Sequence, residues 1–517
     1  MNASGQRPAV SELRLSAYKT HRRAVFPLGP VTLFTGPSGS GKSSALEAYA
    51  ALARLAAGEP LTDVFPDPSG CVPQQARPDV QGRRGFRIGC TVDGPVGPVH
   101  LDVAVQAEPE LRIVGERMTG AGEVLLETAL RDPGRRTVQA AWYTAGAVPV
   151  TRAPLPDDRL ATALLPLRIA GKTAGQRLAL AAAEQVVVAL RSVFPCDPRP
   201  EAMRGPAMRS DGHLRSACDN LAAVLYRTRK ECGTRHAALV EAVREGCAGP
   251  AVTELTVEGA GQRDGAAETA ERAPISGRRT GTPARGLGEG RLATADRRGM
   301  PAERRAALGG AGRSGVGVRA VLGLGEFGHM PMDRLGDGEL RYLGLALVLL
   351  TGPGVLDVDP VADVLPALQT LTVLADGFDR CLDRRQARLL LELAGRMCER
   401  GHIRLVGTVR EVPLTLSSAG EGEGQRPVVG EGGGRGDVPG EGAAAGEGRS
   451  KAGHGHRGGG LVAQRDGARA ESCGGGPGED RGGGGGTRGT GGAEGAFGVR
   501  GLTVVDLGRD QGTRSRP

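Results

Sequence analysis

The segment Gly36-Pro-Ser-Gly-Ser-Gly-Lys-Ser43 constrains the fold of this chain more than any other feature. A glycine, four further residues and then Gly-Lys-Ser make the spacing of a phosphate-binding loop. The apolar run Val31–Thr35 before it predicts a strand, and Ser43–Ala57 after it has apolar residues three and four positions apart, as an amphipathic helix does. A strand, a glycine-rich turn and a helix in this order predict an α/β fold.

The residue types of this loop suit a bound phosphate for separate physical reasons. Glycines let backbone N–H groups turn toward the phosphate, and the helix start adds partial positive charge. Lys42 is expected to reach the β- and γ-phosphates, and the Ser43 hydroxyl is expected to complete a Mg²⁺ site. The alternative is a Gly/Ser-rich turn that happens to contain Lys, which the flanking strand and helix disfavour. The predicted nucleotide-binding residues here are Gly36, Ser38, Gly39, Ser40, Gly41, Lys42, Ser43 and Ser44.

Composition limits how much of the chain packs. Of 517 residues, 85 are Gly and 34 are Pro, and only 3% are aromatic, so the part that folds is expected to be smaller than the length suggests. The net charge of +8 comes from Arg scattered through helices and Gly-rich tracts alike, so charge alone leaves a nucleic-acid surface open.

Cysteine usage and hydropathy suggest the compartment. The nine Cys show no zinc-like spacing and are expected to be reduced thiols. The N-terminal sequence lacks a signal-peptide core, and no window approaches the roughly 20 apolar residues of a membrane span. We therefore expect a soluble cytoplasmic protein with no membrane partner.

Pattern changes divide the chain into six parts. Helical and strand-like periods dominate some of them, including an antiparallel meander after Gly85 and a last strand at Val499–Leu507, while Gly/Arg-rich and Gly/Glu-rich tracts cannot bury enough apolar area to order. The expected parts are 10–205 (N-terminal half of a split domain, with the phosphate-binding loop and the meander), 206–258 (helical lobe), 259–319 (disordered insertion), 320–416 (C-terminal half of the split domain), 417–495 (disordered segment) and 496–517 (terminal strand and tail).

The loop alone does not identify the class of protein, because such loops occur in kinases, GTPases and motors alike. Segments in the second half of the chain narrow the class. Leu371–Ala375 is an apolar strand that ends in Asp376, an arrangement that places a carboxylate beside Mg²⁺. The segment Leu335–Glu339 opens an apolar helix whose N-terminus could present N–H groups to an anion.

Together these segments resemble the ABC-type ATPases of the SMC and recombination-repair branch. They are more closely similar to bacterial AAA-family ATP-binding proteins that carry a Ser-Asp-Gly-Thr signature. The matching pieces are PVTLFTGPSGSGKSSALEAYA, DNLAAVL at Asp219–Leu225 and GDGELRYLGLAL, and the resemblance covers about 10–257 and 320–411.

The resemblance implies an ABC-type P-loop NTPase fold with a mixed central sheet, an antiparallel β subdomain and a helical lobe. It implies ATP and Mg²⁺ as cofactors, with Ser43 and Asp376 at the metal. It also implies a nucleotide-dependent homodimer in which Gly336, Asp337 and Gly338 touch the γ-phosphate held by the Lys42 of a second copy.

Three positions depart from the family pattern. Gly377 stands where the general-base Glu is expected, Val409 aligns with the switch His, and Gly336 replaces the signature Ser. Phosphate binding needs neither the Glu nor the His, so binding can persist while hydrolysis becomes slow. Asp379 and Glu339 are the candidate substitutes for the missing base, with an exposed loop charge as the alternative for each.

Two further assignments stay open. Gln74, Gln75 and Gln81 lie where a Mg²⁺-linking Gln is expected, with Gln74 or Gln75 as the candidates and an ordinary loop as the alternative. Tyr18 is a candidate to stack on adenine, although a core position beside a strand is the favoured interpretation.

The leading hypothesis is an ATP-binding protein and slow ATPase whose head dimerisation drives a task on DNA or on a protein partner. Long heptads are absent between the halves, which disfavours a chromosome-tethering SMC protein. The alternatives are a nucleotide-gated scaffold that does not hydrolyse ATP, favoured by Gly377 and Val409, and a decayed copy that binds no nucleotide.

Overall fold

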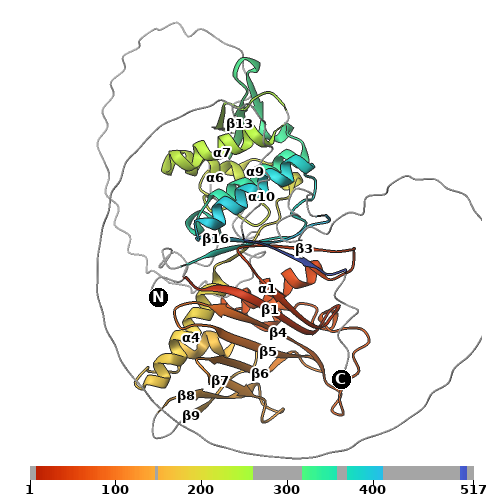
Figure 1. Cartoon of the computed structure of the whole chain (residues 1–517), viewed down its shortest axis with the longest axis vertical. Coiled ribbons are helices and arrows are strands. Elements are labelled where there is room, and N and C mark those ends of the chain that lie inside the picture. The colour runs from red at the N-terminus through yellow and green to blue at the C-terminus, as the bar shows by residue number, and fades with distance from the viewer. Residues whose placement is uncertain are drawn as a thin grey trace, which may run out of the picture. The chain divides into compact units, whose positions relative to one another are not determined.

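The computed structural model describes residues 7–145, 150–247, 249–259, 317–357, 369–411 and 501–508 (Figure 1). The segments expected to be disordered, 259–319 and 417–495, lie outside the described residues except at Gly259 and 317–319. Those exceptions are ordered: Gly259 ends one strand and Gly317 begins the strand that pairs with it, because their apolar residues fill a common core. The predicted limits of that segment were therefore wrong at both ends.

A glycine-rich connection joins a buried strand to a helix, as the sequence predicts. Strand β3 (Val31–Thr35) has four buried residues, and helix α1 (Lys42–Ala56) follows after the turn. The apolar side of α1 includes Ala45, Tyr49 and Leu52, three and four positions apart, and all three are buried. Packing of that side fixes where the helix begins, directly after the glycines.

Strand β3 belongs to a five-stranded sheet in which every pair is parallel, so the expectation of a mixed central sheet is wrong for the described strands. The strand order is β10-β15-β16-β3-β17, so β3 has neighbours from much later in the chain on both sides. Hydrophobic side chains fill both faces, as expected for a parallel sheet. Its other strands are β10 (Val193–Pro195), β15 (Leu371–Ala375), β16 (Ile403–Thr408) and β17 (Leu502–Asp506).

The two faces of this sheet belong to two different hydrophobic cores. Leu374 and Val406 pack into one core together with α1, whereas Val373 and Leu405 pack into the other. Because successive side chains of a strand point to opposite faces, one short strand contributes to both cores. Residues after the carboxyl ends of β3, β15 and β16 are thereby held at one edge of the sheet.

The first core is closed by an eight-stranded antiparallel sheet and helix α4 (Ala174–Arg191). This confirms the predicted meander, which is longer than the sequence pattern indicated. The strand order is β2-β1-β4-β5-β6-β7-β8-β9. The strands are β1 (Ala9–Tyr18), β2 (His21–Pro27), β4 (Arg84–Asp93), β5 (Val99–Glu108), β6 (Arg112–Gly120), β7 (Glu123–Ala129), β8 (Thr137–Tyr143) and β9 (Val150–Pro156).

The second core is mainly helical. Helix α9 is buried along nearly all of its length because apolar residues occupy every side of it, and it packs beside α7 and α10 (Figure 1). A small antiparallel sheet, β11 with β13, β12 and β14, covers α6. The elements are α6 (Leu221–Glu231), α7 (Gly233–Gly246), α9 (Asp337–Leu350), α10 (Arg384–Glu399), β11 (Ala207–Met208), β12 (Glu254–Gly259), β13 (Gly317–Gly323) and β14 (His329–Pro331).

Short helical turns complete the described chain. They are α2 (Leu61–Val64), α3 (Ala161–Leu164), α5 (Pro200–Met203), η2 (Ser69–Cys71), η3 (Leu165–Leu167), η4 (Gly325–Phe327), η5 (Met332–Arg334) and η6 (Pro353–Val355). In the described ranges no helix combines the length and apolar character that crossing a membrane requires.

Candidate nucleotide-binding site

The loop between β3 and α1 adopts a backbone that favours glycine at three positions. The φ angles are 138° at Gly36, 81° at Gly39 and 96° at Gly41. At Gly41, a Cβ would also lie 2.6 Å from the Nε2 atom of His21, so a larger residue would have neither the conformation nor the space. Gly41 directly precedes α1, whose first-turn N–H groups have no acceptor within the helix.

Polar groups of the loop are placed where they can donate to a bound anion. The Lys42 ammonium folds back and donates to the carbonyls of Gly36, at 2.6 Å, and Pro37, at 3.0 Å. The Ser40 hydroxyl is buried with no hydrogen-bond partner among the described residues. Ser38 and Gly39 are exposed, and Ser44 is half-buried in the first turn of α1. A phosphate in the loop would accept from such groups.

Asp376 lies beside this loop at the carboxyl ends of the parallel strands. It follows β15 directly, and its Oδ1 atom accepts hydrogen bonds from the Ser43 hydroxyl, at 3.0 Å, and the Thr408 hydroxyl, at 2.6 Å. Thr408 ends β16, which lies between β15 and β3. The fold thus brings together two residues that the sequence analysis assigned to one metal.

A hydroxyl and a carboxylate are the hard oxygen ligands that Mg²⁺ takes in phosphate sites, where phosphate oxygens and water supply the rest. Ser43 and Asp376 therefore fit the ion. The described residues contain no group of three or more His, Cys, Asp or Glu side chains that could hold a metal by themselves.

The residue after Asp376 has a backbone that disfavours a side chain. Gly377 has a φ of 59°, and its N–H donates to the Thr408 hydroxyl at 2.7 Å. A glutamate here would need the left-handed conformation, which costs roughly 1–2 kcal/mol for a residue with a Cβ. The loop after β15 is thus built around glycine at the position where the resemblance predicts the general base.

Arg341 of α9 fixes this same loop from the other core. Its side chain is 1% exposed and donates to the backbone carbonyls of Asp376, at 3.1 Å, and Gly377, at 2.8 Å. It also donates to Asp197, at 3.1 Å, and to the carbonyl of Pro198, at 2.7 Å. A buried guanidinium with these partners ties the start of α9 to the strand end that carries Asp376.

The two candidate substitutes for the base have other partners. The Oδ2 atom of Asp379 accepts from the Arg410 N–H at 2.8 Å, while its Oδ1 atom is buried without a partner in the described residues. Glu339 accepts from the Gly336 N–H at 3.1 Å and lies beside Cys247, where burial and this carboxylate raise the pKa of the thiol to about 12. Within the described parts of the chain, no hydrogen bond or ion pair joins either carboxylate to Lys42 or Ser43.

The signature-like segment forms the N-terminus of α9. Asp337 forms an ion pair with Arg204 at 2.7 Å, and a Cβ at Gly338 would collide with the carbonyl of Cys381, so glycine is required there by close packing. Among the described residues, no hydrogen bond or ion pair joins Gly336, Asp337 or Gly338 to the loop of the same chain. Their predicted contact with a nucleotide needs a second copy and stays a prediction.

The remaining candidates lie away from these contacts. Gln74 and Gln75 are exposed, and Gln75 accepts from Arg22 at 3.1 Å. Val409 is buried and its N–H donates to the Phe34 carbonyl at 2.9 Å. Tyr18 is 2% exposed and packs edge-on against Phe86, so it occupies the favoured core position and the adenine alternative is wrong for this arrangement.

Thr408, Arg341 and His21 were not predicted from the sequence. The Nε2 atom of His21 donates to the carbonyl of Gly41 at 3.0 Å, and burial lowers the pKa of this imidazole. Thr408 could have been suspected because it ends a buried strand parallel to β15. Arg341 and His21 carry no such signal, since their partners come from distant segments.

Comparison with solved structures finds heads of SMC proteins at low identity. An SMC head bound to the C-terminal winged-helix domain of ScpA matches with a TM-score of 0.37 and 11% identity, covering 78% of this chain and 90% of that one. An SMC head domain from Thermotoga maritima matches with a TM-score of 0.33 and 11% identity, over 78% and 89% of the two chains.

A third, an SMC head with an extended coiled coil bound to the C-terminal domain of ScpA from Pyrococcus furiosus, has a TM-score of 0.34 and 8% identity, over 78% and 90%. No protein-family model and no curated protein matches the chain. A likeness of this size does not by itself assign a function.

Proposed function

We propose that the protein binds Mg²⁺-ATP in the loop Gly36–Ser43. The observation that carries the proposal is the hydrogen bond between Ser43 and Asp376, residues far apart in the sequence, directly beside a glycine-rich loop with an unpartnered Ser40 hydroxyl. Bound magnesium would neutralise charge between the β- and γ-phosphates. Ser43 and Asp376 would hold it, while Lys42 would exchange its two backbone acceptors for phosphate oxygens.

Within this proposal the protein is a slow ATPase of the ABC/SMC-like class, related to bacterial AAA-family ATP-binding proteins. Glycine at position 377 supports slow turnover, because it has no carboxylate that could orient water. The alternative is a nucleotide-gated scaffold that binds ATP without hydrolysis. The same glycine favours it equally, so only a rate measurement separates the two.

Head dimerisation is the second part of the proposal. Gly336, Asp337 and Gly338 stand at the start of α9, whose N-terminal dipole favours an anion. Since no hydrogen bond or ion pair among the described residues joins them to their own loop, the γ-phosphate of a second copy is the proposed partner. Gel filtration with a non-hydrolysable ATP analogue tests this: a shift to dimer is expected, and an unchanged monomer would contradict it. The target of such a dimer would be DNA or a protein.

The binding proposal is tested by calorimetry on the full-length protein. Lys42→Ala is expected to lower the affinity for Mg²⁺-ATP at least tenfold, or about 1.4 kcal/mol, because the charge on the β- and γ-phosphates loses its partner. Lys172→Ala, in an exposed loop, is the matched control and is expected to bind like wild type. Equal affinity in all three proteins, or no heat with wild type, would overturn the proposal.

Phosphate release from the same proteins distinguishes the enzyme from the scaffold. If wild type releases phosphate severalfold faster than Lys42→Ala, with or without DNA, the protein is an ATPase. If both equal the buffer rate while wild type still binds nucleotide, the scaffold hypothesis holds.

A further inference from the structure

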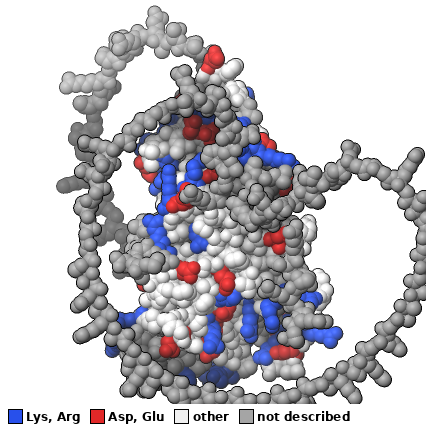
Figure 2. Space-filling view, in the orientation of Figure 1, with Lys and Arg blue, Asp and Glu red and all other residues white. Residues whose placement is uncertain are grey.

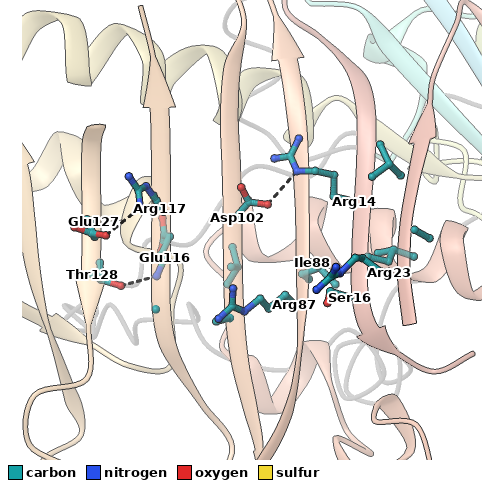
Figure 3. Close-up of a pocket in the computed structure, with 16 residues that line it drawn as sticks. Arg14, Ser16, Arg23, Arg87, Ile88, Asp102, Glu116, Arg117, Glu127 and Thr128 are labelled. Carbon is teal, nitrogen blue, oxygen red and sulfur yellow. Dashed lines mark hydrogen bonds and ion pairs between the residues drawn. The ribbon is translucent and has the colours of Figure 1, made fainter. Parts of the chain in front are cut away.

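A shallow groove of about 540 Å³ crosses the eight-stranded antiparallel sheet on its outer face (Figure 3). Leu13 and Leu15 of β1 are buried in the core that contains α1, so the alternating residues Arg14 and Ser16 lie on the opposite face. The groove is therefore separate from the loop Gly36–Ser43, and binding there can be measured independently of ATP.

The carboxylates of this groove already have partners. Asp102 pairs with Arg14 at 3.1 Å, and Glu127 pairs with Arg117 at 3.6 Å (Figure 3). Glu116 is buried and accepts hydrogen bonds from the first turn of α3. Arg14 also donates to two backbone carbonyls and to Thr91. Its donors are thus committed to the sheet.

Two arginines remain without such compensation. Arg23 on β2 and Arg87 on β4 are exposed, and neither forms an ion pair or hydrogen bond with another described residue. Both are cross-strand neighbours of Ser16, one on each side, so the three residues form one row across adjacent strands. Two strand spacings separate the arginines by about 9.5 Å at Cα. In Figure 3 the Arg23 side chain reaches toward Ser16, while the Arg87 side chain extends toward β5, and rotation of this exposed side chain would bring its guanidinium toward the Ser16 hydroxyl.

The surroundings leave room for a ligand. The row continues to Ala104 on β5, which has a small side chain, and to Gly115 on β6, which has none, so the floor stays low. Ser16 and Arg87 also line an adjoining hollow of about 470 Å³, whose Arg84 is paired with Glu108 at 3.2 Å. Figure 2 shows Lys and Arg side chains gathered over the strands of this sheet, with Asp and Glu between them.

We propose that Arg23, Ser16 and Arg87 form a binding site for a phosphate group. Guanidinium forks match phosphate oxygens in geometry, and two uncompensated positive charges suit a group that carries one or two negative charges. A hydroxyl between them supplies a further donor. The phosphate can come from a polynucleotide backbone lying along the open groove or from a free phosphate ligand.

The test uses the full-length protein and a fluorescent DNA duplex of mixed sequence, followed by anisotropy between about 50 and 200 mM salt. The variant Arg23→Gln/Arg87→Gln is expected to bind at least tenfold more weakly, and the slope of log affinity against log salt is expected to fall by about 2. The control Arg168→Gln/Arg229→Gln removes the same charge from exposed positions outside the sheet and is expected to keep the wild-type slope.

Calorimetry with inorganic phosphate distinguishes the two sources. Duplex binding that the double variant loses assigns the site to a polynucleotide; phosphate binding that it loses, without duplex binding, assigns a free ligand. The proposal is overturned if wild type binds neither probe, or if the double variant binds as wild type does, or if the control loses as much. Lys42→Ala, with ATP as the probe, reports separately on the proposed nucleotide site, and circular dichroism verifies that each variant is folded.

Discussion

His21 connects the turn between β1 and β2 to the glycine-rich loop. Its ring donates to the carbonyl of Gly41 and packs edge-on against Phe26, with the ring centres 5.3 Å apart. A neutral imidazole satisfies both contacts. Burial lowers the pKa of His21, as expected where the charged form would lose its hydration.

The lowered pKa of His21 predicts how acid affects the stability of the folded protein. Below about pH 6.5 the unfolded chain takes up a proton at His21 that the folded protein resists, so the free energy of unfolding decreases as the pH falls. Urea denaturation at pH 7.5 and pH 5 is expected to show a smaller decrease for His21→Gln than for wild type. His236, whose pKa burial also lowers, contributes in the same direction and remains in both proteins. An identical decrease in both would contradict the prediction.

At the scale of single residues, the sequence identified the site residues that belong to short local motifs. Gly36, Gly41, Lys42 and Ser43 follow one spacing, and Asp376 follows a recognisable strand. Arg341 escaped because its role depends on where a distant strand ends, which no local pattern encodes. The role of a buried arginine in a helix can be assigned only once its hydrogen-bond acceptors are known.

Asp383 caps helix α10. Its carboxylate accepts a hydrogen bond from the Gln386 N–H at 2.7 Å, and the Gln386 side-chain oxygen accepts one from the Asp383 N–H at 3.2 Å. This reciprocal arrangement satisfies two donors at the start of the helix.

We expect Asp383→Ala to lower the free energy of unfolding by about 1 kcal/mol, the usual cost of removing such a cap. The affinity for Mg²⁺-ATP is expected to stay within twofold of wild type, because the carboxylate serves its own helix. Thr173→Ala, which removes the cap of α4, is the matched control and is expected to cost a similar amount. Urea denaturation and calorimetry check both quantities, and a large loss of ATP affinity for Asp383→Ala alone would show a direct role.

Elements with strong periodicity were predictable and those in the outer sheet were less so. Val31–Thr35 and Leu371–Ala375 match β3 and β15 at both ends. Strand β2 was not predicted, because its Arg22 and Arg23 hide the alternation. Strand β12 was not predicted, and the start of β13 was placed too late. These two strands pair with each other across a long interval of sequence, and neither has a turn signal beside it.

At the scale of the whole molecule, the sheet that carries the candidate site depends on the last described segment. Strand β17 pairs with β3 along its length, and the Leu507 N–H donates to the Thr35 carbonyl at 2.9 Å, next to Gly36. Without β17, the strand that leads into the loop would become an edge of the sheet.

Deletion of residues 501–517 is therefore expected to lower the midpoint of thermal unfolding by several degrees and to weaken Mg²⁺-ATP binding severalfold, because lost strand pairing costs a few kcal/mol. Deletion of 509–517 keeps β17 and is the control, expected to behave as wild type in thermal unfolding and calorimetry. Equal melting of both shortened proteins would contradict the assigned role of β17.

The order of strands in the parallel sheet also affects synthesis. Strand β3 leaves the ribosome on the order of 400 residues before β16, the first of its two neighbours in the sheet, which at ordinary translation rates is roughly 20–80 s. During that interval Val31, Leu33 and Phe34 have no sheet to join, and the nascent chain carries an unpaired apolar strand. Chaperone occupancy of the emerging chain, until the later strands arrive, is the expected cellular consequence of this topology.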